Sequence, residues 1–392
     1  MRGMTSILIS GAGIAGTTLA YWLRRHGFAP TVVERATGVR EGGYKVDIRG
    51  AALDVVERMG LLDDIRALRT DVRTGSVVDG TGRQVASMDG DSFGGRVHQD
   101  AELHRGDLAR LLHQATDGVE HLFGDSIAAI DGTRVTFAGG LVRHFDLIVG
   151  ADGLHSATRA LAFGPEEHFV HDMGYNVAVF SVPNHLGLDR EELTYVGPGR
   201  TALVYSTRQD TGMKAMFLWR SADKATGRDA QQRALADAYR GSGWEVPRLL
   251  EAMAGAPDFY YDSMSQVRMD RWHAGPVALI GDAAHCASPA SGQGTSLALV
   301  GAYVLAGELK RAGGDHTIAF PAYEARMRSF AETNQALGPA NIKRMVLSSR
   351  SQVRMSMLML RLAGLLPGKD RVMAKVVEPI HRAATAIDLP AW

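Results

Sequence analysis

SILISGAGIAGTTLAYWLRRHGFAPTVVER, residues 6–35, is the stretch that decides the fold. It predicts a strand at Ile7–Ile9, a glycine turn, a helix from about Ile14 to His26 and a second strand at Thr31–Glu34. The first strand is apolar without alternation, which indicates a parallel strand covered on both faces. The stretch therefore predicts a βαβ unit at the start of an α/β domain.

Three glycines, Gly11, Gly13 and Gly16, join the first strand to the helix with the spacing G-x-G-x-x-G. The first permits a tight turn, the second lets the backbone approach a pyrophosphate, and the third allows close packing of helix on strand. The helix N-terminus offers free N–H groups to the anion. Glu34 ends the second strand, where a carboxylate can accept hydrogen bonds from a ribose diol and favours NAD or FAD over NADP.

These features predict a dinucleotide site, and a tight turn in a ligand-free α/β fold is the structural alternative. The residues assigned to the site in this stretch are Gly11, Gly13, Ile14, Ala15, Gly16, Glu34 and Arg35.

The composition is typical of a globular protein. The 392 residues exceed what one core usually holds, which predicts two domains. A formal net charge of zero gives no charge excess for nucleic acid or a membrane surface. The single cysteine, Cys286, excludes an internal disulfide and fits a reducing cytosol, so we expect a cytoplasmic protein. We find no stretch of transmembrane length and expect no bound metal.

The segment from about Gly174 to Arg220 differs in composition from the sequence before it. The pieces YNVAVFSV, LTYVG, RTALVYST and MKAMFLWR are rich in strand formers and are separated by turns such as GPG and RQDTG. They predict an antiparallel sheet inserted into the nucleotide-binding fold. The tail from about Phe330 to Ala386 reads as helical and rich in methionine.

We therefore predict a Rossmann-like α/β domain with an inserted antiparallel sheet and C-terminal helices. Residues 1–173 and 265–330 are assigned to nucleotide binding, and residues 174–264 to substrate binding. Residues 331–392 are expected to bridge the two domains, with a dimer face as the second interpretation.

Two further motifs place an aspartate at the end of a strand. In DLIVGADGLHSATRA the strand Asp146–Val149 runs into Asp152, where an ordinary Asp-Gly turn is the alternative. In LIGDAAHCASPASGQG, residues 279–294, a buried strand ends at Asp282. A buried carboxylate needs a partner, and a polyol hydroxyl would serve. Gly292 and Gly294 leave the following loop without side chains; a helix cap is the alternative.

Together, GAGIAG, GADGLHS..R and GDAAH...P..GQG resemble the motifs of class A FAD-dependent aromatic monooxygenases of the para-hydroxybenzoate hydroxylase fold, over roughly residues 5–310. The resemblance implies non-covalent FAD, with Asp282 on the ribitol and the loop from Pro289 to Gly294 along the isoalloxazine. It also implies Asp152 near FAD and NAD(P)H, and Arg105 of HRGDL on the flavin chain.

The segment REGGYKVDIRGAALDVVERMGLL most resembles the compact branch with the tetracycline-inactivating and antibiotic-tailoring monooxygenases. That likeness implies a flavin contact for Asp47 and an NADPH contact for Arg40. The helix after residue 294 departs from the family pattern, because Ser296 and Gly301 stand where an Asn and an Asp are frequent.

The function implied is an NAD(P)H-driven monooxygenase, with NADPH preferred over NADH. A C4a-hydroperoxyflavin would insert one oxygen of O₂ into an aromatic or polyketide-like molecule. We expect no catalytic triad and interpret His285 as a loop-ordering residue. Candidate substrate-binding residues are Phe180, Tyr205, Met216, Leu218 and Pro289.

Other readings of the same scaffold stay open. The first is an FAD oxidoreductase that desaturates or cyclises without inserting oxygen, and the second is a non-catalytic flavin-binding protein. The tryptophans form no WxWxIP pattern, which disfavours a halogenase. We expect no nucleic-acid or membrane partner, and a monomer or homodimer.

Overall fold

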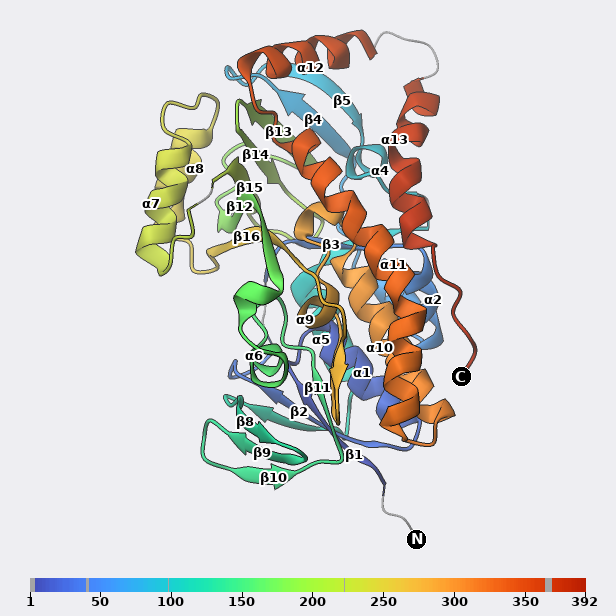
Figure 1. Ribbon diagram of the computed structural model, residues 1–392. Coiled ribbons are helices and arrows are strands. Elements are labelled where there is room, and N and C mark those ends of the chain that lie inside the picture. Colours follow the sequence, from blue (N-terminus) through green and yellow to red (C-terminus); the bar gives the residue numbers. More distant parts are fainter. Residues whose placement is uncertain (1–3, 40–41, 98, 222, 364–368) are drawn as a thin grey trace.

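The first sheet of the protein is built around the predicted βαβ unit. In the computed structural model, which describes residues 4–39, 42–97, 99–221, 223–363 and 369–392, this unit is β1 (Ser6–Ser10), α1 (Ile14–Arg25) and β2 (Ala29–Glu34) (Figure 1). The strand order is β17-β18-β11-β1-β2-β7, and all neighbours are parallel except β17 and β18. The added strands are β7 (Glu120–Phe123), β11 (Leu147–Gly150), β17 (His273–Ala274) and β18 (Val277–Leu279).

Both faces of this sheet are covered, which confirms the prediction for the first strand. Ile7 and Ile9 point into the large core that α1 and the buried α10 (Gly294–Arg311) share. Leu8 points the opposite way, as strand alternation requires, against a three-stranded sheet. That small sheet is β8 (Ile127–Asp131), β9 (Arg134–Phe137) and β10 (Val142–His144), flanked by α6 (Ala157–Phe163).

The second sheet is larger than the predicted insertion. Its strand order is β16-β12-β15-β14-β13-β4-β5. The strands are β4 (Thr74–Val78), β5 (Gln84–Asp89), β12 (Val170–Val182), β13 (Glu191–Gly197), β14 (Arg200–Tyr205), β15 (Met213–Arg220) and β16 (Tyr260–Val267). The range 174–264 thus omits the hairpin β4–β5, which comes from the N-terminal half. The edge of β13 pairs with β4 in parallel, and every other neighbouring pair is antiparallel.

The two faces of the second sheet pack against different partners. One face holds Phe180, Phe217 and Trp219 against the helices α7 (Arg228–Ala238) and α8 (Val246–Met253). The other face meets the short 3-10 turn η2 (Pro289–Ser291) and the long helix α11 (His316–Met345). Figure 1 shows α7 and α8 in yellow on one side and α11 in orange on the other.

The C-terminal region is helical, as predicted. Helix α12 (Arg350–Ala363) contacts β5 and β13, and α13 (Lys369–Ala384) packs on α11. No helix in the described ranges is long and apolar enough to cross a bilayer. The shorter elements are α2 (Ala51–Arg58), α3 (Leu62–Ala67), α4 (Gly90–Gly94), α5 (Arg105–Gln114), α9 (Asp282–His285), β3 (Lys45–Ile48), β6 (Ala101–His104) and η1 (Glu166–His168).

Candidate active site

The glycine turn between β1 and α1 has two crowded glycines and one open one. Gly11 has φ of 103°, and a Cβ on it would lie 2.6 Å from the carbonyl oxygen of Ala151. A Cβ on Gly16 would lie 1.9 Å from the carbonyl oxygen of Gly11, whereas one on Gly13 would meet no described atom within 4 Å. The first intrahelical bond runs from the Thr17 N–H to the Gly13 carbonyl, at 3.0 Å. The earlier N–H groups of α1 therefore face the open space beside Gly13 and can receive an anion.

Glu34 lies against this turn at the end of β2. Its carboxylate accepts hydrogen bonds from the N–H of Ala12 at 3.0 Å and from that of Ala36 at 2.9 Å. The acid is therefore held beside the glycine turn, where the sequence placed it, while Arg35 is exposed.

The loop after β11 is organised by its own aspartate. Asp152 accepts hydrogen bonds from the Thr158 N–H and Oγ1, both at 2.9 Å, and from Ser156 Oγ. Its carboxylate thus caps the start of α6. The fully buried Arg159 donates to the carbonyl oxygens of Leu154 at 2.7 Å and Ala283 at 3.1 Å, and so ties this loop to α9. Sequence reasoning missed that tie, although Arg159 is the arginine of the GADGLHS..R pattern.

Asp282 lies in the neighbouring loop, where β18, which pairs with β11 in parallel, leads into α9. Gly281 makes the turn with φ of 59°, and a Cβ on Gly294 would lie 3.9 Å from Asp282 Oδ1. The carboxylate therefore adjoins the N-terminus of α10. Burial raises the pKa of Asp282, and the Cys286 thiol and the Arg105 guanidinium oppose that rise.

Gln293, just before α10, has a buried side-chain amide without a hydrogen-bond partner among the described residues. Its side chain is fully buried, and within the described part of the chain neither its Oε1 nor its Nε2 has a hydrogen-bond partner. Buried amides are nearly always paired, so this one fits a polar ligand beside the loop that follows Asp282.

Arg105 is the first residue of α5 and lies beside Tyr44. Its N–H donates to the Tyr44 carbonyl at 3.1 Å, and a Cβ on Gly43 would lie 3.6 Å from its own Cβ. Burial raises the pKa of Tyr44, and the charge of Arg105 opposes that rise. Arg105 therefore brings a positive charge close to Tyr44 and Asp282.

The FAD binding domain family model matches residues 4–332. The chain belongs to the FAD binding domain family. The residues fit this flavin nucleotide, because the open space at Gly13, the acid Glu34, the half-buried Asp282 and the unpaired amide of Gln293 offer groups that a phosphate or a hydroxyl can meet.

Relatives of this flavoprotein match over most of their length. The uncharacterized protein Rv1260 of Mycobacterium tuberculosis is 47% identical over 353 residues, which cover 86% of this chain and 94% of that one. A protein of Legionella longbeachae named flavin-dependent monooxygenase is 39% identical over 339 residues, 85% of this chain and 87% of its own. The crystal structure of tetracycline destructase Tet(55) superposes with a TM-score of 0.85 at 34% identity, covering 100% of both chains.

These findings confirm the predicted class. The protein is an FAD-dependent monooxygenase with the fold of class A enzymes, and it resembles tetracycline-inactivating members of that class.

The remaining cofactor predictions for this monooxygenase concern Asp47 and Arg40. Asp47 is already paired, with its Oδ2 at 2.9 Å from Arg49 Nη2, and the Arg49 N–H donates to Ser296 Oγ at 3.2 Å. The flavin contact expected of Asp47 therefore stays a prediction. Arg40 lies outside the described residues.

The predicted substrate residues divide between the two faces of the second sheet. Met216 and Leu218 lie on the face that meets Ala290 of η2. Phe180 pairs with Ala215 and is therefore one residue out of phase with them: it lies on the opposite face and stacks on Phe217, with ring centroids 5.5 Å apart. Because its side chain is enclosed by the α7–α8 core, Phe180 is corrected from a substrate-binding candidate to a core residue.

Tyr205 lies on the same face of the sheet as Met216 and Leu218 but under other side chains. It is fully buried, its Oη accepts from the Lys45 N–H at 3.2 Å, and the Lys45 ammonium stands 4.9 Å from its ring centroid. Tyr205 could contact a substrate directly only if Lys45 moved away from its ring.

Lys45 belongs to a buried charge network that sequence reasoning did not find. Its Nζ lies 2.6 Å from Glu192 and 3.1 Å from Glu102, and Arg96 pairs with Glu102 at 2.5 Å. Burial alone would raise the pKa of Glu102, but Lys45 and Arg96 outweigh it and lower this pKa to about 2. No local pattern marks the network, because its members lie on β3, β6, β13 and the loop after α4.

Proposed function

We propose that this FAD-dependent monooxygenase uses NADPH, or NADH, and O₂ to oxygenate an aromatic or polyketide-like molecule. The proposed pocket lies between η2 and the face of the second sheet that carries Met216 and Leu218. The observation that supports it most is the apolar cluster that runs from this sheet face to Ala290 and includes Met264 on the edge strand β16. Pockets with broad apolar walls and few polar groups suit flat apolar ligands.

The cofactor side of the pocket has the residues to hold FAD. The N-terminus of α1 beside Gly13 would take the pyrophosphate, Glu34 the ribose and Asp282 the ribitol, with Arg105 as a nearby positive charge. When bound, FAD supplies hydride acceptance and oxygen activation, and the protein supplies position and exclusion of water.

Pro289, Gly292 and Gly294 would leave the flavin edge open to a ring. A Cβ on Gly292 would meet no described atom within 4 Å, and Pro289 is exposed at the start of η2. This arrangement supports a flat substrate in edge contact with the cofactor, as the names of the tetracycline destructases also suggest.

The reductant should bind transiently and from the surface. The G-x-G-x-x-G turn is the site assigned to FAD, so NAD(P)H needs other groups, among which Arg40 remains our candidate. Asp152 is a weaker candidate for binding NAD(P)H than Arg40, because its carboxylate already accepts hydrogen bonds from Ser156 and Thr158.

We also propose that the protein acts in the cytoplasm. Cys286 is buried and unpaired, which supports a reducing compartment such as the cytoplasm. We expect the protein to act on small molecules as a monomer or homodimer.

The test is oxygen incorporation. The FAD-loaded protein is incubated under ¹⁸O₂ with NADPH and a panel of polycyclic phenols, tetracyclines and, for comparison, small non-aromatic compounds. We expect compounds that accelerate NADPH oxidation to gain one labelled oxygen. A product formed in good yield without label would contradict oxygenation and indicate desaturation or cyclisation. Stimulation restricted to small non-aromatic compounds would contradict the proposed pocket.

A further inference from the structure

The exposed apolar side chains of the protein concentrate on one short helix. Ten large hydrophobic residues are exposed in the described part of the chain, and four of them lie on α12: Met355, Leu358, Met359 and Leu362. Their exposed fractions are 48–60%. They follow the spacing i, i+3, i+4 and i+7, so they form one stripe along the helix, which we call the α12 face.

The opposite side of α12 packs on the second sheet. Val353, Met357 and Leu360 are half-buried, and the helix contacts β5 and β13. Figure 1 shows α12 lying across the end of the molecule that is far from β1. The α12 face therefore points away from the protein. Contiguous exposed apolar surface of this kind marks an interaction site, whereas single exposed apolar residues need no explanation.

Arginines line one side of the α12 face. Arg350, Arg354 and Arg361 are exposed, and among the described residues none forms an ion pair with them. With about 3.6 residues per turn, the three lie within about 40° of one another around the helix axis. Leu358 follows about 40° from Arg354, so the row of arginines adjoins the apolar stripe.

The basic excess extends beyond α12. From residue 333 to residue 361 the chain has five basic residues and no acidic one. Lys343 and Arg344 are exposed at the end of α11, shortly before α12 begins. The zero net charge of the whole chain, from which we expected no membrane partner, hides this local excess.

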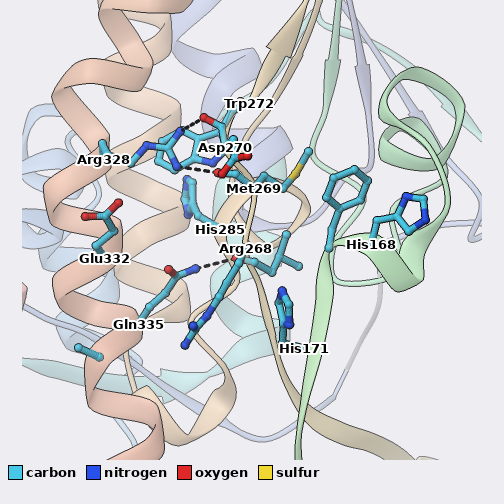
Figure 2. Close-up of a pocket in the computed structure, with 13 residues that line it drawn as sticks. His168, His171, Arg268, Met269, Asp270, Trp272, His285, Arg328, Glu332 and Gln335 are labelled. Carbon is cyan, nitrogen blue, oxygen red and sulfur yellow. Dashed lines mark hydrogen bonds between the residues drawn. The ribbon is translucent and has the colours of Figure 1, made fainter.

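The cavity of about 620 Å³ between β16, α9 and α11 differs in charge from the α12 face (Figure 2). Its lining includes Arg268 and Arg328 but also Asp270 and Glu332. Charge therefore does not favour one kind of ligand in the cavity, whereas every charged residue of α12 is an arginine.

We propose that α12 binds the surface of a membrane that contains anionic phospholipids. A helix in the membrane interface buries its apolar face at the boundary of the acyl chains, and the Lys and Arg residues beside that face meet the headgroups. The α12 face and its row of arginines have this arrangement, and each basic residue close to an anionic surface adds to binding. The helix has 14 residues, too few to span a bilayer, so the binding is peripheral.

A second copy of the chain fits the α12 face less well than an anionic membrane does. Two identical faces in contact would bring together two rows of arginines, and α12 has no carboxylate to pair with them. A basic face of this kind complements a surface of negative charge. No residue assigned to FAD takes part, so membrane binding does not depend on the proposed oxygenation.

The test is co-sedimentation of the full-length, FAD-loaded protein with lipid vesicles. One set of vesicles contains equal parts of phosphatidylcholine and anionic phosphatidylglycerol, and the other contains phosphatidylcholine alone. The double variant Leu358→Gln with Met359→Gln removes apolar surface from the α12 face and keeps good helix formers. Leu141→Gln with Val142→Gln is the matched control, because both residues are exposed and lie at β10, away from α12.

A second pair of variants tests the charge. Arg354→Gln with Arg361→Gln removes two arginines beside the α12 face. Arg233→Gln with Arg248→Gln is the control with the same change in net charge, because both residues are exposed on α7 and α8. A flavin content equal to that of the unmodified protein verifies that each variant is folded.

We expect the unmodified protein to bind the anionic vesicles about tenfold or more tightly than the neutral ones, and this preference should shrink at high salt. Each double variant on α12 should weaken binding to anionic vesicles about tenfold or more, and each control should leave it unchanged. Equal binding of the unmodified protein to both vesicles, or to neither, would overturn the proposal, and this comparison needs no variant.

Two further outcomes would also overturn it. The first is vesicle binding by both α12 variants that equals that of the unmodified protein, because another surface would then be responsible. The second is a dimer in sedimentation velocity that Leu358→Gln with Met359→Gln dissociates, without vesicle binding by the unmodified protein, because the α12 face would then belong to a contact between two copies. None of these measurements needs turnover, so failure of the proposed oxygenation would leave them readable.

Discussion

Replacing Gly13 with alanine should remove tight FAD binding without unfolding the chain. The new methyl group would meet no described atom within 4 Å, and the φ of −76° at this position suits alanine. Since Gly13 is the N-cap of α1, where alanine is disfavoured, the free energy of unfolding of the FAD-free protein should fall by no more than about 1 kcal/mol. The methyl group would instead occupy the space for the pyrophosphate, and the Kd for FAD should rise about tenfold or more, which is about 1.4 kcal/mol.

Gly16→Ala is the matched control with the opposite outcome. Its methyl group would lie 1.9 Å from the Gly11 carbonyl oxygen and 3.2 Å from Ile9 Cγ2. Gly11 cannot retreat easily, because its N–H donates to the Val33 carbonyl at 2.7 Å. We expect a loss of about 3 kcal/mol or more of unfolding free energy, at the upper end for overpacked sites.

Urea unfolding of the FAD-free proteins and titration of FAD by flavin fluorescence measure the two effects separately. If Gly13→Ala bound FAD as tightly as the unmodified protein, the pyrophosphate would have to lie elsewhere and the assignment of the turn would be wrong. If Gly16→Ala were as stable as the unmodified protein, the close approach of α1 to β1 would be refuted.

Three further predictions concern the cleft and its walls. Asp282→Ala should weaken FAD binding by about 1.5–3 kcal/mol, the loss of a bond to a charged group, and so lower the FAD retained per chain. Asp152→Ala should mainly lower the free energy of unfolding, by about 1 kcal/mol, because a helix cap is lost. Equal flavin contents in the two variants would refute this division. Glu102→Gln should destabilise the protein by about 3 kcal/mol at pH 7, because it removes the carboxylate that Lys45 and Arg96 share and leaves Lys45 with Glu192 and Arg96 with Asp91. The folded-state pKa of Glu102 is depressed from 4.5 to about 2, so urea unfolding should show this difference shrinking as pH falls through that window. Leu218→Ala should raise KM for an aromatic substrate about tenfold and, because Leu218 is fully buried, should also cost about 2–5 kcal/mol of stability. Phe180→Ala should cost about 3–5 kcal/mol of stability with KM unchanged; a KM effect at Phe180 would contradict the face assignment.

The cofactor half of the protein could be predicted from the sequence because its signals are local. The turn that contains Gly11 and Gly16 needs glycine for steric reasons that act within a few residues. Glu34 follows at the end of the next strand, so a single βαβ unit brings it back to the turn. The short apolar strand that ends just before Asp282 was also predicted from local pattern, while the contact of Asp282 with FAD stays a prediction.

Only the tertiary structure decided which side of the second sheet each residue faces and what completes the site. Strand alternation shows which residues of one strand share a face. Whether that face, with Leu218, or the other, with Phe180, meets η2 depends on how the sheet docks. The parallel pairing of β4 with β13 and the hydrogen bond from Arg159 to the Ala283 carbonyl both join segments far apart in the chain. Such contacts depend on packing between elements, and a pattern read along one segment contains no information about the partner across the core.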